Sequence, residues 1–206
     1  MKICKVEGCS NKHLAKGYCA KHYRQMRVYG KITSVGRTIY DPNEIIIHDD
    51  YAELLLYNRK CEEIGRSILD LDDVDKIKEY KWRLISSGYV TTEINKKIIL
   101  LHRLITNCPD NMCVDHIDRN PLNNRKNNLR ICTPQENNFN KGLIKTNTSG
   151  ATGVSWCNRE SKWRARIQIN SKEIHLGMFE NKKDAIEARK RAEIKYFGEY
   201  RNKENK

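Results

Sequence analysis

Residues 114–130 read VDHIDRNPLNNRKNNLR, and this stretch decides how the chain is interpreted. A single Asp-His pair, Asp115 and His116, is followed by five asparagines. Asparagine is a poor former of helices and strands. Five asparagines in so short a stretch therefore indicate either a turn-rich surface loop or a loop whose side-chain amides bind a ligand.

The polar residues of this loop can build a site for phosphodiester cleavage around one divalent ion. Asp115 offers a carboxylate oxygen, and Asn128 offers a neutral amide oxygen; both are hard ligands that suit Mg²⁺ or Mn²⁺. Neighbouring side chains on an extended strand point to opposite faces, so the ring of His116 must approach from elsewhere in the site. A neutral imidazole can then act as general base on a water, with an asparagine across the loop to orient it.

The segments LHRLI and VDHIDRNPLNNRKNNLRICT closely resemble the HNH endonucleases of phages and group I introns. That resemblance implies a ββα-metal core, with Asp115 and Asn128 as ligands of one catalytic ion and His116 as the general base. It also implies that Asn124, the middle letter of the motif, braces the loop that carries His116. The third letter is Asn here rather than a second His.

The segments around the motif predict a scaffold of strands and short helices. Residues 44–57 read as two apolar strands around a polar turn, and residues 69–82 have apolar residues at helical spacing. Residues 86–105 predict a hairpin that turns at Asn95-Lys96 and runs on into His102. The capping box TPQE, which starts at Thr133, predicts a short helix.

Several residues near the motif allow two interpretations. His102 either supports the site from a neighbouring strand or is a buried histidine with satisfied hydrogen bonds. Arg103 and Arg125 either contact phosphate or are structural. Three cysteines lack a fourth ligand at suitable spacing and are interpreted as small packed residues: Cys108, Cys113 and Cys132.

The charge of the chain favours a polyanionic partner. Its 206 residues carry 39 Lys and Arg against 26 Asp and Glu, a net charge of +13. Residues 41–80 are acidic, with 12 Asp and Glu against 5 Lys and Arg, so we expect the two flanks to hold nucleic acid. The alternative is a basic surface that serves solubility or ribosome attachment.

The N-terminal segment CKVEGCSNKHLAKGYCAKHY predicts a structural zinc site. Two ligand pairs, each on a short turn, suit tetrahedral zinc with three thiolates and one imidazole: Cys4, Cys9, Cys19 and His22. His13 is a competing fourth ligand with less apt spacing, and reduced, unligated cysteines are the alternative. The basic arm at 23–37 either tracks phosphates or is a solvated helix and linker.

The C-terminal segment predicts a sheet with one basic face. Trp163, Ala165 and Ile167 alternate strictly with Arg164 and Arg166, so one face is apolar and the other charged. Turns divide residues 152–179 into three strands, and a helix follows that is capped by Asn181 and ended by Gly198. Alone, this pattern fits a half-buried strand with solvated arginines as well as a surface that reads DNA.

The strings Gly-Val-Ser-Trp, Trp-x-Ala-x-Ile and Leu-Gly-x-Phe resemble the Apetala-two-type DNA-binding domain over about 50 residues. In that family the open sheet face lies in the major groove. Position by position, the resemblance places five residues toward DNA: Ser155, Arg164, Arg166, Gln168 and His175.

Together these patterns predict an α+β chain of three modules. They are a zinc-binding module with a basic arm (1–40), an HNH nuclease domain (41–142) and a three-stranded antiparallel sheet on one helix (143–206). We expect a site-directed DNA endonuclease of the homing type, active on double-stranded DNA as a nicking monomer rather than a dimer. The rivals are a non-catalytic DNA-binding regulator and a nuclease acting on RNA, whose A-form major groove is too narrow for a sheet.

The sequence shows no apolar run of the roughly 18 residues that span a membrane. The start MKICKVEGCS has no apolar signal core. We therefore expect a cytoplasmic protein, and the phage-type resemblance implies a phage-infected or bacterial cell.

Overall fold

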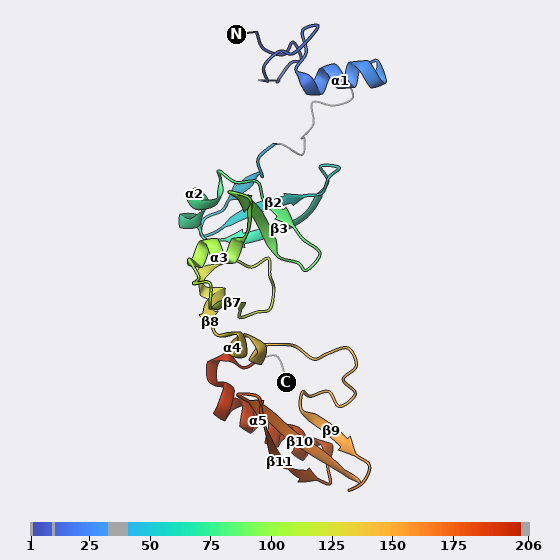
Figure 1. Ribbon diagram of the computed structural model, residues 1–206, viewed down its shortest axis with the longest axis vertical. Helices are drawn as coiled ribbons and strands as arrows, with labels where there is room; N and C mark the ends of the chain where they lie inside the picture. Colours follow the sequence, from blue (N-terminus) through green and yellow to red (C-terminus); the bar gives the residue numbers. More distant parts are fainter. Residues whose placement is uncertain (1, 10, 33–40, 203–206) are drawn as a thin grey trace. The chain divides into compact units, whose positions relative to one another are not determined.

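A computed structural model describes residues 2–9, 11–32 and 41–202 (Figure 1). The chain forms two compact units: Met1–Asp41 with Asn58–Glu62, and Pro42–Tyr57 with Glu63–Lys206. The predicted division into three modules stays a prediction, and residues 33–37 of the basic arm lie outside the described residues. Within the described ranges, every helix is too short or too polar to cross a lipid bilayer.

The fold is mixed α+β, as predicted, and consists of short helices and small antiparallel sheets. The first sheet has the order β1 (Ile45–Ile47), β2 (Ala52–Tyr57), β3 (Glu63–Leu69). The second has the order β4 (Arg83–Leu84), β5 (Val90–Ile94), β6 (Lys97–Leu100). The predicted turn at Asn95-Lys96 is confirmed, because both residues have positive φ, as a two-residue hairpin of this type requires.

One apolar cluster supports the central part of the chain. It combines residues of β2 with the fully buried Trp82 and reaches Leu129 in the motif. The predicted helix at 69–82 is shorter than expected: a 3₁₀ turn, η1 (Leu71–Asp73), leads into α2 (Val74–Ile77). The indole of Trp82 donates to the carbonyl of Ile77 at 2.9 Å, so a side chain takes a carbonyl that a longer helix would use.

The motif itself folds as two strands followed by a helix, and helix α3 (Leu101–Thr106) precedes it. Strand β7 (Cys113–His116) pairs antiparallel with β8 (Leu129–Cys132). The 3₁₀ turn η2 (Lys126–Asn128) lies directly before β8. Helix α4 (Pro134–Phe139) then starts at the predicted capping box, in which Thr133 and Glu136 bond each other's backbone N–H.

The C-terminal segment forms a three-stranded sheet covered by one helix (Figure 1). The strands are β9 (Val154–Cys157), β10 (Lys162–Ile169) and β11 (Lys172–Phe179), and α5 (Lys182–Phe197) is followed by η3 (Gly198–Tyr200). Ala165 and Ile167 pack under α5, so the apolar face of β10 is the covered one. Asn181 is the N-cap residue, but its side chain donates to Asp184 instead of accepting from the helix backbone.

Candidate functional site

His116 and Asn124 meet in a buried pocket of the motif. His116 is 6% exposed and Asn124 is fully buried, with His116 Nε2 and Asn124 Oδ1 3.3 Å apart. The Asn124 amide nitrogen donates to the Pro121 carbonyl and to Ser67 Oγ. A carbonyl can only accept, so the amide orientation is fixed and its oxygen faces the ring. His116 Nε2 therefore carries the hydrogen, which leaves Nδ1 as the basic nitrogen.

Strand β3 holds the Asn124 end of this pair in place. The backbone N–H of Asn124 donates to the Ile68 carbonyl at 2.7 Å, and Ile68 N–H donates to the Leu122 carbonyl at 2.8 Å. Ser67 Oγ adds a bond to the same Leu122 carbonyl. Sequence analysis missed Ser67, because nothing in the local pattern relates it to an asparagine 57 positions away.

Burial keeps the two histidines of the site neutral. It lowers the pKa of His116 below its ordinary value, against the opposing effect of the Asn124 hydrogen bond. His102 lies on α3, not on a strand as expected, and its ring packs edge-on against His116 at 5.1 Å between centroids. Burial is the largest cause that lowers the pKa of His102 to about 3, and the nearby His116 and Arg103 act in the same direction. His102 is therefore an uncharged part of the wall around His116.

Asp115 is already bonded by two protein donors. Arg130, its partner across the β7–β8 ladder, donates through Nε at 2.8 Å and forms a nearly buried ion pair. The Asn140 amide, just after α4, donates to both carboxylate oxygens and to the His116 carbonyl. Sequence analysis missed Arg130 and Asn140. The two-residue alternation along β8 was the signal that could have placed Arg130 opposite Asp115.

Asn128 holds the loop between the two strands. Its amide oxygen accepts from the Asp118 backbone N–H at 3.0 Å, and its nitrogen donates to the Asp118 carboxylate and the Asn123 carbonyl. Partial burial acts to raise the pKa of Asp118, but hydrogen bonds from Asn120, Asn123 and Asn128 bring it below its usual range. Several asparagines of the motif therefore have a structural task.

The side-chain oxygens of Asp115 and Asn128 are of the chemical type that binds a hard divalent ion. Asp115 Oδ1 accepts from Asn140 at 3.0 Å, and the Asn128 amide oxygen accepts from Asp118. Carboxylate and amide oxygens each have more than one lone pair, so both atoms retain acceptor capacity. The opposing feature is the Arg130 guanidinium, which competes with a cation for Asp115.

Carboxylates of the acidic segment at 41–80 form ion pairs and hydrogen bonds with residues of the motif. Arg125 pairs with Asp50 and Asp70, and the Lys126 backbone N–H donates to Asp70. Lys126 also pairs with Asp72. The open question about Arg125 is thereby answered in favour of a structural partner.

The remaining neighbours of the motif are structural as well. Arg103 donates to the carbonyls of Cys108, Pro109 and Met112, so its guanidinium closes the turn after α3. Burial raises the pKa of the Cys132 thiol to about 11, which agrees with a small packed residue.

The five predicted DNA-facing residues share the open face of the C-terminal sheet. Arg164 lies opposite Ser155, and Arg166 lies opposite His175. A bulge after Ala165 lets Leu176 enter the core and brings His175 to the open face. Gln168, next on that face of β10, lies opposite Glu173.

The charges of this face are partly satisfied within the protein. Arg166 forms an ion pair with Glu173 at 2.6 Å. Arg164 has a buried Nε, for which the described residues supply no hydrogen-bond partner. That nitrogen is buried, so contact of Arg164 with a ligand on this face would have to use its other guanidinium nitrogens.

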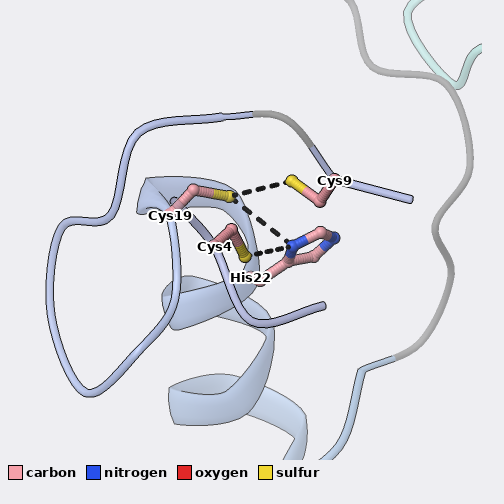
Figure 2. Close-up of side chains that lie close together, drawn as sticks. All are labelled: Cys4, Cys9, Cys19 and His22. Atoms are coloured by element: carbon pink, nitrogen blue, oxygen red, sulfur yellow. Dashed lines mark hydrogen bonds between the residues drawn. The ribbon is translucent and has the colours of Figure 1, made fainter. Parts of the chain in front are cut away.

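A second cluster lies in the N-terminal unit, where four predicted ligands converge (Figure 2). Their ligand atoms all lie within 4.8 Å of one another; the residues are Cys4, Cys9, Cys19 and His22. The competing ligand His13 is used elsewhere, because its Nε2 accepts from the Gly17 backbone N–H at 2.9 Å. Gly17 has φ +86, and an added Cβ would lie 2.8 Å from the Lys5 side chain, so the predicted turn requires glycine.

Comparison with known proteins supports a nuclease. Residues 100–139 match a family described as HNH endonuclease. An uncharacterized HNH endonuclease of Acanthamoeba polyphaga mimivirus is 37% identical over 111 residues, which cover 50% of this chain and 56% of that protein. Protein 3.8 of Escherichia phage T7 is 42% identical over 65 residues, which cover 32% of this chain and 54% of that protein. The chain thus spans about half the length of these relatives, and no solved structure matches it. The His116 pocket therefore lies within a segment that is similar to HNH endonucleases.

Proposed function

We propose that this chain is a site-directed DNA endonuclease of the homing type that nicks duplex DNA with His116 as general base. The observation that carries the proposal is the contact between His116 Nε2 and Asn124 Oδ1, which leaves Nδ1 as the basic nitrogen. This contact lies inside the segment that matches HNH endonuclease.

In the proposed reaction, His116 Nδ1 takes a proton from a water that attacks the scissile phosphorus. The phosphorus–oxygen bond to the 3′ oxygen breaks as the new bond forms, and the departing oxygen takes a proton from a second water. The products are a 5′ phosphate and a 3′ hydroxyl, and the proton held by His116 passes to solvent. The lowered pKa of His116 keeps the imidazole able to accept that proton at neutral pH. Asn124 holds the ring while the proton moves.

Asp115 and Asn128 are the proposed ligands of one Mg²⁺ or Mn²⁺. The bound ion would neutralise charge on the phosphate and stabilise the departing oxygen. Asn140 and Arg130 orient the Asp115 carboxylate. Because Arg130 shares that carboxylate, it sets how much negative charge remains for the cation.

The open face of the C-terminal sheet is the proposed DNA-reading surface. Arg164 and Arg166 both lie on this face, and arginine is the residue most often used to read guanine in a major groove. Replacing Arg164 and Arg166 together with alanine should weaken binding to the preferred duplex more than binding to random duplex, in a titration at fixed salt. An equal loss on both duplexes would mean that they contact only phosphate.

The decisive experiment is cleavage of a supercoiled plasmid that carries a candidate target, with Mg²⁺ or Mn²⁺. Wild type should convert it to open circle, and His116→Ala should be slower by about 10²–10⁴-fold, the usual contribution of a general base. Asn127→Ala is the matched control, since Asn127 belongs to the same loop but is exposed. Linear product would point to paired active sites, and DNA binding without cleavage across metals and targets would favour a non-catalytic regulator.

A further inference from the structure

We propose that Cys4, Cys9, Cys19 and His22 bind one Zn²⁺ ion, that His22 binds it through Nδ1, and that the ion orders helix α1 (Ala20–Tyr29). The site is separate from the proposed nuclease site, since its four residues belong to the other compact unit. It is therefore a second metal centre with a structural task.

Three of the distances between the ligand atoms are close to those of a zinc tetrahedron. Zinc lies about 2.3 Å from a thiolate and about 2.05 Å from an imidazole nitrogen, so two sulfurs should be about 3.8 Å apart and a sulfur and a nitrogen about 3.6 Å. The Cys9 and Cys19 sulfurs are 3.9 Å apart, and His22 Nδ1 lies 3.5 Å from Cys19 and 3.2 Å from Cys4 (Figure 2). A disulfide between Cys9 and Cys19 would need about 2.05 Å.

The ring nitrogen is assigned by the same contacts. Nδ1 of His22 faces two of the sulfurs, whereas Nε2 is buried without a hydrogen-bond partner in the described part of the chain. Three thiolates and one imidazole are soft and borderline ligands, which select zinc over magnesium or calcium. All four positions of a tetrahedron are filled by protein, so no position remains for a substrate.

The link to α1 follows from where the ligands lie on it. Cys19 is the N-cap residue of α1, yet its side chain caps no backbone N–H, and His22 lies in the first turn. The first turn contains no acidic residue, so thiolates are the negative groups available to the positive end of the helix dipole. A ten-residue helix is marginal alone, and a metal that fixes its first turn supplies the nucleus that it lacks.

Zinc content of the purified full-length chain tests the proposal. We expect one zinc ion per chain in wild type and its loss in Cys4→Ser and in Cys19→Ser. Two matched controls should keep the ion: Cys157→Ser, a cysteine of β9, and His13→Gln, the histidine that bonds Gly17 instead. Less than half an ion per wild-type chain after zinc titration, iron in place of zinc, or equal loss in the controls would overturn the proposal.

Two further measurements test which His22 nitrogen binds zinc and whether zinc orders α1. Long-range ¹H–¹⁵N correlation spectra should show His22 bound through Nδ1; binding through Nε2 would contradict the assignment. Removal of zinc should abolish helical circular dichroism equal to about the ten residues of α1 and leave the thermal transition of the larger unit in place.

The tests of the zinc site and of the proposed nuclease are independent of each other. His116→Ala should keep its zinc even where it abolishes cleavage. A zinc-bound chain that cuts no DNA would therefore contradict only the proposed nuclease, whereas a chain that takes up no zinc on titration and yet cuts DNA would contradict only the zinc centre.

Discussion

The two clusters of potential metal ligands are built in opposite ways. Around His116, Asn124 donates to Ser67, and Asn140 and Arg130 donate to Asp115, so the side chains are fixed by hydrogen bonds within the protein. In the N-terminal cluster, three sulfurs and one imidazole face each other, and among the described residues of that unit the buried apolar side chains are two of these cysteines, Cys4 and Cys19. The first site should therefore be stable before metal arrives, while the second should need its ion in order to fold.

Arg130→Ala should have the largest effect on this contrast. It leaves the buried Asp115 carboxylate without its charged partner, and it removes the bonds from Arg130 to the carbonyls of Glu199 and Tyr200. Removing one partner of a buried pair costs about 3–5 kcal/mol, so chemical denaturation should show a loss of that order.

Melting temperatures of Arg130→Ala with and without divalent ions provide a second test. If Asp115 is a metal ligand, Mg²⁺ or Mn²⁺ should raise the melting temperature of Arg130→Ala more than that of wild type, because the competing cation is gone. Equal shifts would show that Asp115 does not hold the ion. Arg130→Lys keeps the charge and should fall between the two.

Ser67→Ala should have an intermediate effect. Ser67 and Asn124 are both fully buried, and the substitution leaves the Asn124 amide and the Leu122 carbonyl each short of a partner. We expect a loss of about 1–3 kcal/mol in the free energy of unfolding, with a lower kcat and an unchanged KM. Ser87→Ala, at an exposed serine, is the matched control. A change in KM alone would argue against a positioning role for Ser67.

The pH dependence of stability should report the buried His102. The pKa of His102 is about 3 in the fold against an ordinary 6.5, so the unfolded chain takes up the proton first as pH falls. The contribution of this group is complete above pH 6.5 and is lost as pH falls toward 3, at about 1.4 kcal/mol per pH unit. His102→Phe keeps a ring in this place, and denaturation between pH 7 and 4 should then be less steep. An unchanged slope would mean that His102 does not titrate with unfolding.

The elements predicted from sequence were those specified by neighbouring residues. The turn at Asn95-Lys96, the capping box at Thr133 and the turn glycine Gly17 depend on local chemistry, and the structure has all three. His102 was misplaced, because the apolar run around it has no period that separates a strand from a helix.

The supports of the site depend on residues far apart in the chain. Ser67 and Asp70 come from the acidic segment at 41–80, which the sequence predicts to lie away from nucleic acid. Ser67 bonds Asn124, and Asp70 pairs with Arg125. Phe197, at the end of α5, is buried and stacks on Phe139 with 3.9 Å between ring centroids. No local pattern specifies such a partner.

The spread of these supports along the chain has a consequence for the order of folding during synthesis. The four N-terminal ligands occur within the first 22 residues, so that cluster can close soon after it leaves the ribosome. The His116 pocket needs Ser67 from one side and Asn140 from the other, so it is complete only when roughly two thirds of the chain has been made. A nascent chain that ends before Asn140 already carries the Asp-His pair without the Asn140 amide that holds it, so its site is still unassembled.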